Sequence, residues 1–441
     1  MSRQTICVHI GQAGVQLGSA IWELIGIEHG IKTNGTLAKR YINLGEKSAC
    51  SFFYPLDLKR TKYAPRCLFI DTESMVIDEI RTGCYKRFYP ENALITGIED
   101  ASNLFPRGFK VAGQHVLNPS VEGIRLLSEA SDCLNGIIVF KSCGGGTGSG
   151  TTALFLDEIY EEFSKINISE LAVIPAPFIS TSIVESYNAV LTLFRTMKNI
   201  SLSLIIDNQA LYDISKSKLE LERPSYFNVN RIIAQIVSSI TASLRFESVL
   251  STDFNLFQTN LIPYPQLKYP VISYAPIIPS SSKVAEPHNI YALTEEVFQR
   301  KSFTVKCYPE YGEYMACALL YRGKNCGVRE ITQAVGKLKK SSLKFVDWSP
   351  TGFKLGINRQ PPPYVQYSCL GKIKRSVCLI ANSTCISQVL DYILQKFDLL
   401  YRRKAYVHWF TGEGLEEAEL VEARQEVLKL LLSYLQNGHI S

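Results

Sequence analysis

The first half of the chain alternates short, almost wholly apolar runs with longer amphipathic segments, and this alternation restricts the possible folds more than any other feature. The apolar runs predict strands at residues 5–10, 67–70, 136–140, 171–176 and 202–206. Strands that lack a polar face are covered on both sides, as in a parallel sheet whose crossover connections are helices. We therefore expect an α/β fold built on a parallel sheet.

Each of the five predicted strands is followed by side chains or glycines that can bind a ligand. Ligands of open α/β sheets bind at the carboxyl ends of the strands, so these residues are expected to meet at one edge. In chain order they are Gly11 and Gln12, then Asp71 and Glu73, then the glycine run at 142–150, the hydroxyl-rich "PFISTSIVES" at 177–186, and Asp207 with Asn208. Five such strand ends together predict one nucleotide pocket.

The glycine run is "SCGGGTGSG", with five glycines among the nine residues 142–150. Without side chains, successive N–H groups can converge on an anion, and the helix predicted after Gly150 adds a positive end. Thr147 and Ser149 could donate hydroxyl groups to the same anion. The run matches neither the phosphate loop GxxxxGK[ST] nor a strict GxGxxG, which disfavours a dinucleotide-dependent enzyme. The alternative is a flexible or tightly packed loop.

Residues near the other strand ends have chemistry that suits a nucleoside triphosphate. Asp71 and Glu73 end a buried strand, where a carboxylate could serve a Mg²⁺ ion or could cap the next helix. The amides of Asn208 and Asn230 can read the edge of a base, and Tyr226 offers a ring on which a base could stack. Taken alone, each of these three is also compatible with a turn or core role.

Composition excludes several classes of protein. The 441 residues are 46% hydrophobic and 20% charged, as in an ordinary globular protein, and the net charge of +6 comes from no basic block that would indicate nucleic acid binding. Twelve cysteines without a CxxC pair, and six histidines without zinc-ligand spacing, predict free thiols in a reducing compartment. Residues 1–11 read as a strand interrupted by Gln4 and His9 rather than as a signal peptide. With no membrane-spanning run, we expect a cytoplasmic protein and no membrane partner.

The second half of the chain predicts a further α/β region and a helical end. Residues 228–246 have the apolar spacing of a helix buried on at least one broad face. Strand-like runs mixed with proline and glycine turns then occur at 268–278, 313–323, 344–357 and 376–382, and helical patterns at 386–405 and 414–435. We expect three domains, at residues 1–207, 208–383 and 384–441.

The order of motifs resembles the tubulin family, and its alpha-type members in particular. The resemblance runs almost end to end. It rests on "VIDEIRTG" (76–83), "GGGTGSG" (144–150), "IVSSITASLRF" (236–246), "FVDWSPTGFKLGIN" (345–358) and "AYVHWFTGEGLEEAE" (405–419). The long segment 360–372 is alpha- rather than beta-type. The resemblance implies a Rossmann-like GTPase domain, a core helix, an intermediate α/β domain and a C-terminal helical hairpin.

The resemblance also implies GTP and Mg²⁺ as ligands and assigns residues to them. It places Glu73 at Mg²⁺, Thr181 and Glu185 near the ribose, and Asn208 and Asn230 at guanine with Tyr226 stacked on the base. The residues assigned to the phosphates are Gln12, Asp100, Asn103, Ser142, Gly144, Gly145, Gly146 and Thr147. Guanine rather than adenine follows only from the resemblance.

The chain departs from the family at the residue that acts on a neighbouring subunit. In alpha-type chains, the loop after the core helix carries two acids, and the second positions or activates the water that attacks the GTP of the next beta subunit. Here Asp253 is retained, but the second position is Leu256. An isobutyl group can neither accept a proton nor orient water, and the adjacent Asn255 is too weakly basic to replace the acid. We therefore expect no intact catalytic residue and slow hydrolysis of the partner's GTP.

Other departures concern contacts and modifications. The chain ends "LLLSYLQNGHIS" with no acid beyond Glu426, so tail polyglutamylation and tail-dependent motor binding are not expected. Val284 and Ala285 replace the Tyr-His pair of the family's lateral-contact loop. Lys39 and Lys47 lie in a region that aligns too loosely to assign the lumenal acetylation site.

Two functional readings follow. In the first, the chain is a structural subunit that holds GTP, forms a heterodimer with beta-tubulin and enters the microtubule cytoskeleton, where it contacts lattice neighbours. In the second, it pairs with beta-tubulin but does not polymerise, or it caps ends. A free-standing metabolic enzyme fits poorly, because the sequence shows no nucleophile–base constellation.

Overall fold

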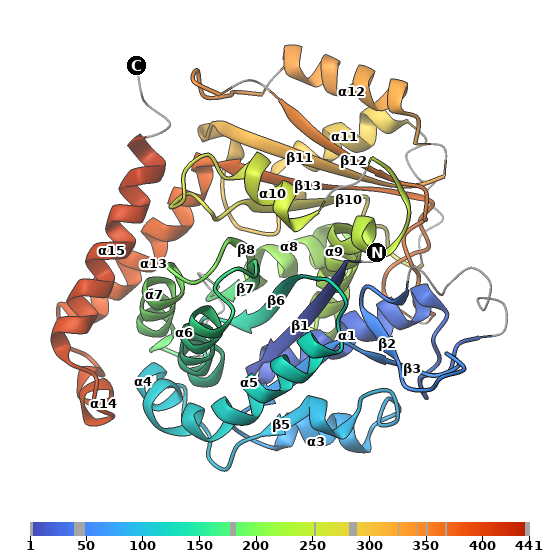
Figure 1. Cartoon of the computed structure of the whole chain (residues 1–441). Coiled ribbons are helices and arrows are strands. Elements are labelled where there is room, and N and C mark those ends of the chain that lie inside the picture. The colour runs from blue at the N-terminus through green and yellow to red at the C-terminus, as the bar shows by residue number, and fades with distance from the viewer. Residues whose placement is uncertain are drawn as a thin grey trace. The chain divides into compact units, whose positions relative to one another are not determined.

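The computed structural model describes residues 3–38, 49–176, 182–250, 253–281, 289–324, 326–341, 343–349, 352–366 and 368–436. The chain divides into two compact units (Figure 1). The first contains Met1–Ser203 and Leu390–Leu430, and the second contains Leu204–Val389 and Leu431–Ser441. The first unit therefore combines the amino-terminal half of the chain with a late segment.

The first unit is built on the predicted parallel sheet. Its strand order is β5-β4-β1-β6-β7-β8, and the division between the two units falls within β8. The pairs β5–β4, β4–β1, β1–β6 and β6–β7 are parallel. The strands are β1 (Gln4–Ile10), β4 (Cys67–Asp71), β5 (Leu94–Thr96), β6 (Leu134–Ser142), β7 (Ile168–Ile174) and β8 (Leu202–Asp207). All five predicted strands are confirmed; β5, three residues long, was too short to predict, as was the hairpin of β2 (Phe53–Pro55) and β3 (Tyr63–Pro65).

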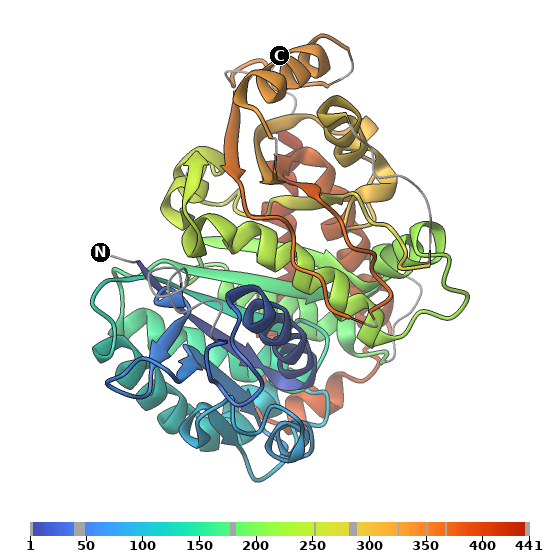
Figure 2. The ribbon, with the colours of Figure 1, turned by 90° about the vertical axis from the view of Figure 1, so that its right-hand side faces the viewer.

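Helices flank both faces of this sheet (Figures 1 and 2). The sheet helices are α1 (Gly11–His29), α3 (Met75–Thr82), α5 (Gly113–Glu129), α6 (Thr152–Glu162) and α7 (Glu185–Thr196), with the single turn α4 (Phe105–Arg107) before α5. The carboxyl-terminal helices are α13 (Ser387–Tyr401), α14 (Val407–Gly412) and α15 (Glu417–Gln436). On α7, the hydroxyl of Tyr187 donates to the Ala405 carbonyl at 3.0 Å, and its ring packs edge-on against Phe397 and Phe410. This contact fixes the α13–α14 segment to the sheet unit.

The second unit confirms the predicted α/β region after the core helix. Its mixed sheet has the order β10-β13-β11-β12-β9. Among the described residues of this sheet, β11 and β12 pair in parallel and the other three pairs are antiparallel. Its strands are β9 (Ser248–Leu250), β10 (Val271–Ala275), β11 (Tyr314–Gly323), β12 (Phe353–Asn358) and β13 (Arg375–Ser383), and its helices are α8 (Asn208–Lys218), α9 (Tyr226–Arg245), α10 (Phe254–Leu261), α11 (Ile290–Phe298) and α12 (Val328–Ser341). The core helix α9 matches the predicted segment 228–246 and buries most of its residues.

The first sheet also buries an ion pair that its apolar strand pattern does not suggest. Lys141 on β6 and Glu170 on β7 are fully buried, with Nζ and the carboxylate 2.7 Å apart. The hydroxyl of Ser203 on β8 donates to the same carboxylate at 2.6 Å. Removing one partner of a buried ion pair leaves the other charge buried and unpaired. Lys141 and Glu170 are therefore expected to tolerate substitution only when both are replaced together.

The two polar residues that interrupt the first strand are buried rather than exposed. Gln4 accepts a hydrogen bond from the Cys133 backbone N–H at 2.8 Å. His9 lies between the rings of Phe69 and Phe140, with centroid separations of 4.8 and 4.7 Å, and its Nε2 accepts from the indole N–H of Trp22 at 3.0 Å. Burial lowers the pKa of His9 from 6.5 to about 3, so the ring is neutral in the folded protein.

The buried His9 predicts a loss of stability on mild acidification. Between the folded pKa of about 3 and the unfolded value of 6.5, the unfolded chain binds a proton that the folded chain excludes. The contribution of the neutral His9 to the free energy of unfolding is therefore present above pH 6.5 and is lost as the pH drops through that value. His9 alone should lower the free energy of unfolding by about 1.3 kcal/mol between pH 7 and pH 5.5. Denaturant titrations at the two pH values should show this loss in the wild-type chain and a smaller one in His9→Leu. Equal losses in both chains would exclude His9 as the source.

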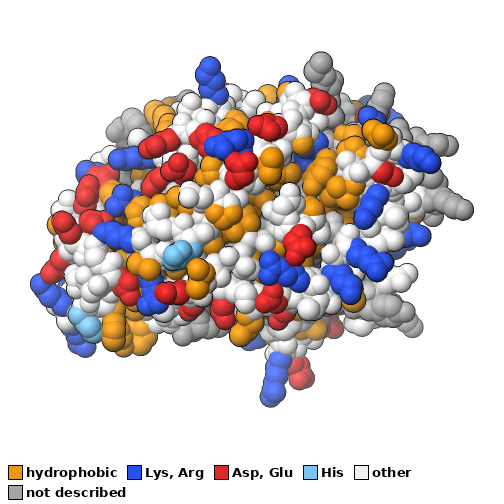
Figure 3. Space-filling model, turned by 60° about the horizontal axis from the view of Figure 1, so that its bottom comes forward, with side chains coloured by type: hydrophobic (Ala, Val, Ile, Leu, Met, Phe, Trp, Pro, Cys, Tyr) orange, Lys and Arg blue, Asp and Glu red, His pale blue; other side chains and the backbone are white. Residues whose placement is uncertain are grey.

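The surface charges are of both signs, as in the sequence. On the face shown in Figure 3, lysine and arginine side chains are interspersed with aspartate and glutamate. Among the helices in the described ranges, none is long and apolar enough to span a bilayer. All twelve cysteines are free thiols, as the sequence predicts.

Candidate functional site

The loops that follow β1, β4, β5 and β6 meet at the carboxyl edge of the first sheet. At Gly11, where φ is +74°, an added Cβ would lie 3.0 Å from the Gly148 nitrogen. The hydroxyls of Thr72 and Thr147 are 2.6 Å apart and hydrogen-bonded. At Gly146, an added Cβ would lie 2.7 Å from the Ala101 carbonyl oxygen. The residues that the sequence placed at separate strand ends are thus neighbours around the glycine run.

Three glycines of the run serve backbone packing. A methyl group at Gly146 or Gly148 would lie 2.7 or 2.5 Å from the carbonyl oxygens of Ala101 and Ser142, respectively. At Gly150 it would overlap the carbonyl oxygen of Phe105. Backbone atoms at these distances cannot move aside as the end of a flexible side chain can. These three positions therefore require glycine for the fold itself.

The other two glycines, Gly144 and Gly145, face a different environment. The only described atom within 4 Å of a Cβ added at Gly145 is Asn103 Oδ1, at 3.9 Å. The three atoms nearest to a Cβ added at Gly144 all belong to the Glu185 side chain, the closest at 3.1 Å. The backbone at Gly145, which is half-buried, is therefore open on the side that it shares with Asn103, whereas Gly144 is buried beside Glu185. The backbone at 144–145 thus forms a cradle with an opening at Gly145, and N–H groups beside such an opening suit an anion such as a phosphate.

The helix that follows starts earlier than the sequence predicts. A turn of π-helix at Thr147–Thr151 continues into α6, so the helical end lies directly after Gly146 instead of after Gly150. This brings the positive end of the helix next to the cradle. Ser149 is fully buried and its hydroxyl donates to the carbonyls of Gly145 and Gly146, so the expectation that it could donate to a ligand is wrong.

Acidic side chains gather at the ends of β4 and β5. Asp71 is buried at the end of β4, whereas Glu73 and Asp100 are exposed. Burial raises the pKa of Asp71 to about 7, and the negative charges of Glu73 and Asp100 add to this effect. A cation placed here would relieve this repulsion, and carboxylate oxygens are the donors that Mg²⁺ prefers.

These carboxylates fit a metal that is held jointly with a phosphate. No group of three or more His, Cys, Asp or Glu residues within the described ranges could hold a metal ion by itself. Mg²⁺ is usually bound by one or two carboxylates together with substrate phosphates and water. The residues present at this edge therefore fit a nucleotide–Mg²⁺ pair better than a free metal centre.

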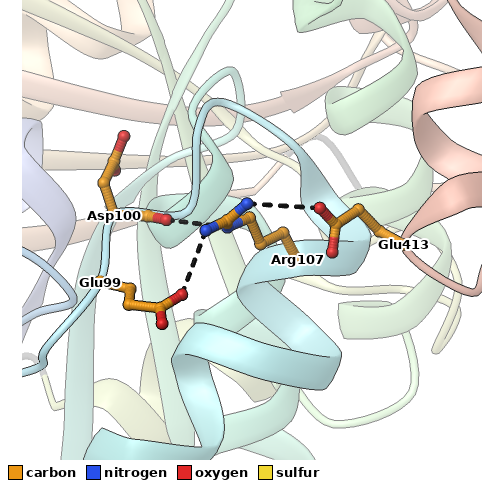
Figure 4. A network of polar contacts seen from close by, with 4 residues as sticks. All are labelled: Glu99, Asp100, Arg107 and Glu413. Carbon is orange, nitrogen blue, oxygen red and sulfur yellow. Dashed lines mark hydrogen bonds and ion pairs between the residues drawn. The ribbon is translucent and has the colours of Figure 1, made fainter.

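Arg107 holds the loop that carries Asp100 and Asn103 (Figure 4). Its Nε donates to the Asp100 carbonyl at 3.1 Å, and its two Nη atoms reach the carboxylates of Glu99 at 3.1 Å and Glu413 at 3.4 Å. The Asp100 carboxylate points away from Arg107 in Figure 4. The arginine thus fixes the backbone of Asp100 without neutralising its side chain, which stays available to the site.

Asn188 is a second supporting residue, and the sequence analysis missed it. It lies on α7, is fully buried, and its side chain contacts both the loop at 103–105 and the glycine run. The segment "ESYNAV" reads as an ordinary helix start, so nothing in the pattern of residues distinguishes this asparagine from a polar residue on a helix surface.

The remaining predicted residues of the first unit lie at helix starts or at the end of a strand. Gln12 is the second residue of α1 and is exposed. Glu185 is the first residue of α7, where its Oε1 accepts from the Ser182 N–H at 3.1 Å and its side chain faces Gly144. Ser142 ends β6 and its hydroxyl accepts from the Gly144 N–H at 3.3 Å. Thr181 lies outside the described residues.

The three residues predicted to read a base lie in the second unit. Asn208 begins α8, after Asp207, whose carboxylate caps the helix by accepting from the Gln209 N–H at 2.9 Å. Tyr226 and Asn230 lie one turn apart at the start of α9 and so share a face of that helix. Tyr226 is 50% exposed, and its only described aromatic neighbour, Tyr212, meets it edge-on at 6.0 Å. A flat partner could still stack on this ring.

Leu256 lies in the first turn of helix α10, not in a loop. Asp253 occupies the N-cap position, Asn255 is exposed, and Leu256 is half-buried. An acid at this position would therefore project from a helix and have a defined direction. The predicted departures at Val284, Ala285, Lys39, Lys47 and the last five residues lie outside the described residues.

Comparison with known proteins agrees with this arrangement. The model of the Tubulin/FtsZ family GTPase domain matches residues 4–216, and the model of the tubulin C-terminal domain matches residues 265–395. The tubulin alpha-2 chain of Caenorhabditis elegans is 44% identical over 437 residues, which cover 99% of this chain and 97% of that protein. The glycine run, the acidic strand ends and the starts of α1, α6, α7 and α8 all lie within the matched GTPase domain, whereas α9 and α10 begin beyond it. The chain therefore belongs to the tubulin family, as an alpha-tubulin-like member that carries the family's GTPase domain.

Proposed function

We propose that this chain is an alpha-type subunit that holds GTP with Mg²⁺, pairs with beta-tubulin and enters microtubules. The observation that carries the proposal is the cradle at Gly144 and Gly145, which opens at Gly145 toward Asn103 and lies at the start of a helix. The acidic group of Asp71, Glu73 and Asp100 adds a place for the cation that a triphosphate requires.

In this proposal the residues of the site bind and orient the nucleotide. Backbone N–H groups at 144–146 and the start of the π turn would hold phosphate oxygens, because each charge-assisted hydrogen bond contributes roughly 1.5–3 kcal/mol. Glu73, supported by the buried Asp71, would serve Mg²⁺. The further proposed contacts are Gln12, Asp100, Asn103, Ser142 and Thr147 to the phosphates, Thr181 and Glu185 to the ribose, and Asn208, Asn230 and Tyr226 to guanine.

The proposed subunit has lost its action on the nucleotide of its partner. Leu256 stands where an acid would position water, and its apolar side chain offers neither a base nor an acceptor. We propose that a lattice containing this chain retains GTP in the partner subunit for longer. Retained GTP, rather than a change in this chain's own site, would distinguish such a lattice from an ordinary one.

The alternative function is a GTP-binding partner of beta-tubulin that does not polymerise or that caps ends. The observation in its favour is the replacement of the lateral-contact pair by Val284 and Ala285. Both functions use the same nucleotide cradle, so the site itself does not discriminate between them. Assembly does.

Co-expression with a beta-tubulin followed by microtubule pelleting tests this choice. We expect the chain in the pellet with assembled polymer, at a level comparable to that of an ordinary alpha-tubulin treated in parallel. Heterodimer that stays in the supernatant while the control pellets would favour the non-polymerising function. A chain that fails to co-purify with beta-tubulin would contradict both.

A further inference from the structure

The side chain of Asn188 connects the two loops that form the nucleotide cradle. Its Nδ2 donates to the carbonyl of Asn103 at 2.7 Å and to the carbonyl of Gly144 at 2.8 Å. Its Oδ1 accepts from the Phe105 backbone N–H at 3.1 Å. The residue is fully buried on α7, so these bonds are protected from water. One amide therefore links the loop at 103–105 to the glycine run.

The loop that contains Asn103 has an unfavourable backbone conformation. Ser102 and Asn103 both have positive φ, of 48° and 55°, in the left-handed region that residues with a side chain seldom adopt. Two consecutive residues in this region persist only where the surroundings fix them. Arg107 fixes the loop before them, through the Asp100 carbonyl, and Asn188 fixes it after them, through the Asn103 carbonyl.

From these contacts we infer that Asn188 is a positioning residue for the nucleotide, because it sets the distance between Asn103 and the backbone at 144–145, which is open at Gly145. The inference rests on the proposed binding of GTP at that cradle. Asn188 is fully buried, and both polar atoms of its side chain bond to the backbone of the two loops. It acts by holding both walls in the one arrangement in which their donors converge on the same phosphate.

An asparagine side chain is the one that fits these three partners. It supplies two donors and one acceptor at fixed angles. Aspartate has the same shape but no donors, and it would place a charge against two carbonyl oxygens. Serine supplies one donor only. Each substitution should therefore loosen the loops while leaving the cradle residues unchanged in sequence.

The rate at which bound GTP is lost tests the inference. The full-length chain is co-expressed with beta-tubulin, and the heterodimer is chased with excess unlabelled nucleotide. We expect Asn188→Asp to lose its GTP at least about tenfold faster than the wild-type chain, since two hydrogen bonds to the loops are removed. Asn188→Ser, which keeps one donor and adds no charge, should fall between them and covers a failure of the aspartate chain to fold.

A matched control separates positioning from general stability. Thr196 lies on the same helix, is equally buried, and its hydroxyl donates to the Thr192 carbonyl of its own helix at 2.9 Å. Thr196→Val should lower the denaturation midpoint yet leave the rate of GTP loss unchanged. In addition, Ser102→Gly should slow GTP loss in the Asn188→Ser chain, because glycine adopts the left-handed conformation without strain.

The outcomes are distinguishable. Faster loss in both Asn188 variants, none in Thr196→Val, and partial rescue by Ser102→Gly would support the inference. Rates in the Asn188 variants equal to those of wild type or of Thr196→Val would overturn it while leaving the proposed function intact. A wild-type heterodimer with no GTP on this chain would instead contradict the proposed function.

Discussion

Replacing Leu256 with glutamate is expected to raise the rate of GTP hydrolysis in assembled polymer by about 100-fold, because a positioned general base typically contributes 10²–10⁴ in rate. The side chain projects from the first turn of α10, so the added carboxylate has a defined direction. Phosphate release from polymer made with beta-tubulin measures the rate. The effect should appear in the polymer and not in free heterodimers, since we propose that an acid at this position acts on the neighbouring subunit's nucleotide.

The adjacent residue provides a matched control for this substitution. Asn255→Glu adds the same carboxylate one position earlier, about 100° around the helix, where it should not reach the same water. Leu256→Gln restores polarity and size without a base and should give little of the increase. If wild-type polymer already hydrolyses GTP as fast as polymer of ordinary dimers, and Leu256→Glu adds nothing, Leu256 does not limit the reaction.

The second large effect is expected to separate two glycines that are three residues apart. Gly145→Val should lower GTP retention by at least about 100-fold, because its side chain would fill the space in which a phosphate is proposed to lie and remove several charge-assisted bonds. The fold itself should tolerate the change. Only Asn103 Oδ1, at 3.9 Å, lies within 4 Å of the added Cβ among the described atoms.

Gly148→Val should behave in the opposite way. Its Cβ would lie 2.5 Å from the Ser142 carbonyl oxygen, which is backbone and cannot swing aside. Overpacking of this kind costs about 1–3 kcal/mol or more, so the yield and denaturation midpoint should fall. Thermal denaturation and nucleotide content, measured on both variants, check the pair. Similar losses of stability in both would contradict the division of the glycine run into cradle and packing positions.

Much of the fold could be predicted because the decisive signals are local. The five apolar runs became strands, and the polar ends of the runs that form β1, β4 and β6 met at one edge, since parallel strands deliver their carboxyl ends to the same side of a sheet. The limits of single elements were less certain. β7 begins at Ile168, three residues before the predicted start. The prediction began too late because the polar residues Ser169 and Glu170 interrupt the apolar run, although both are buried in the strand.

The finer features of the site depend on contacts that no local pattern encodes. Five glycines look alike in the sequence, but only the positions of Ala101, Ser142 and Phe105 show which three are needed for packing. In the sequence Ser149 resembles a ligand donor, but in the structure its hydroxyl donates to carbonyl groups of its own loop. The partners of Asn188 are 44 to 85 residues away along the chain, so its role follows from the tertiary structure alone.

The nucleotide content of the purified heterodimer tests the central claim most directly. Denaturation of the complex followed by chromatography gives the identity and amount of the released nucleotide, and a Gly145→Val chain in the same complex assigns it to a subunit. The proposed function predicts one GTP on this chain, unhydrolysed, together with Mg²⁺, and its loss in the Gly145→Val complex. Release of GDP or ATP from this chain, or a nucleotide content that Gly145→Val leaves unchanged, would contradict the claim that this cradle holds GTP.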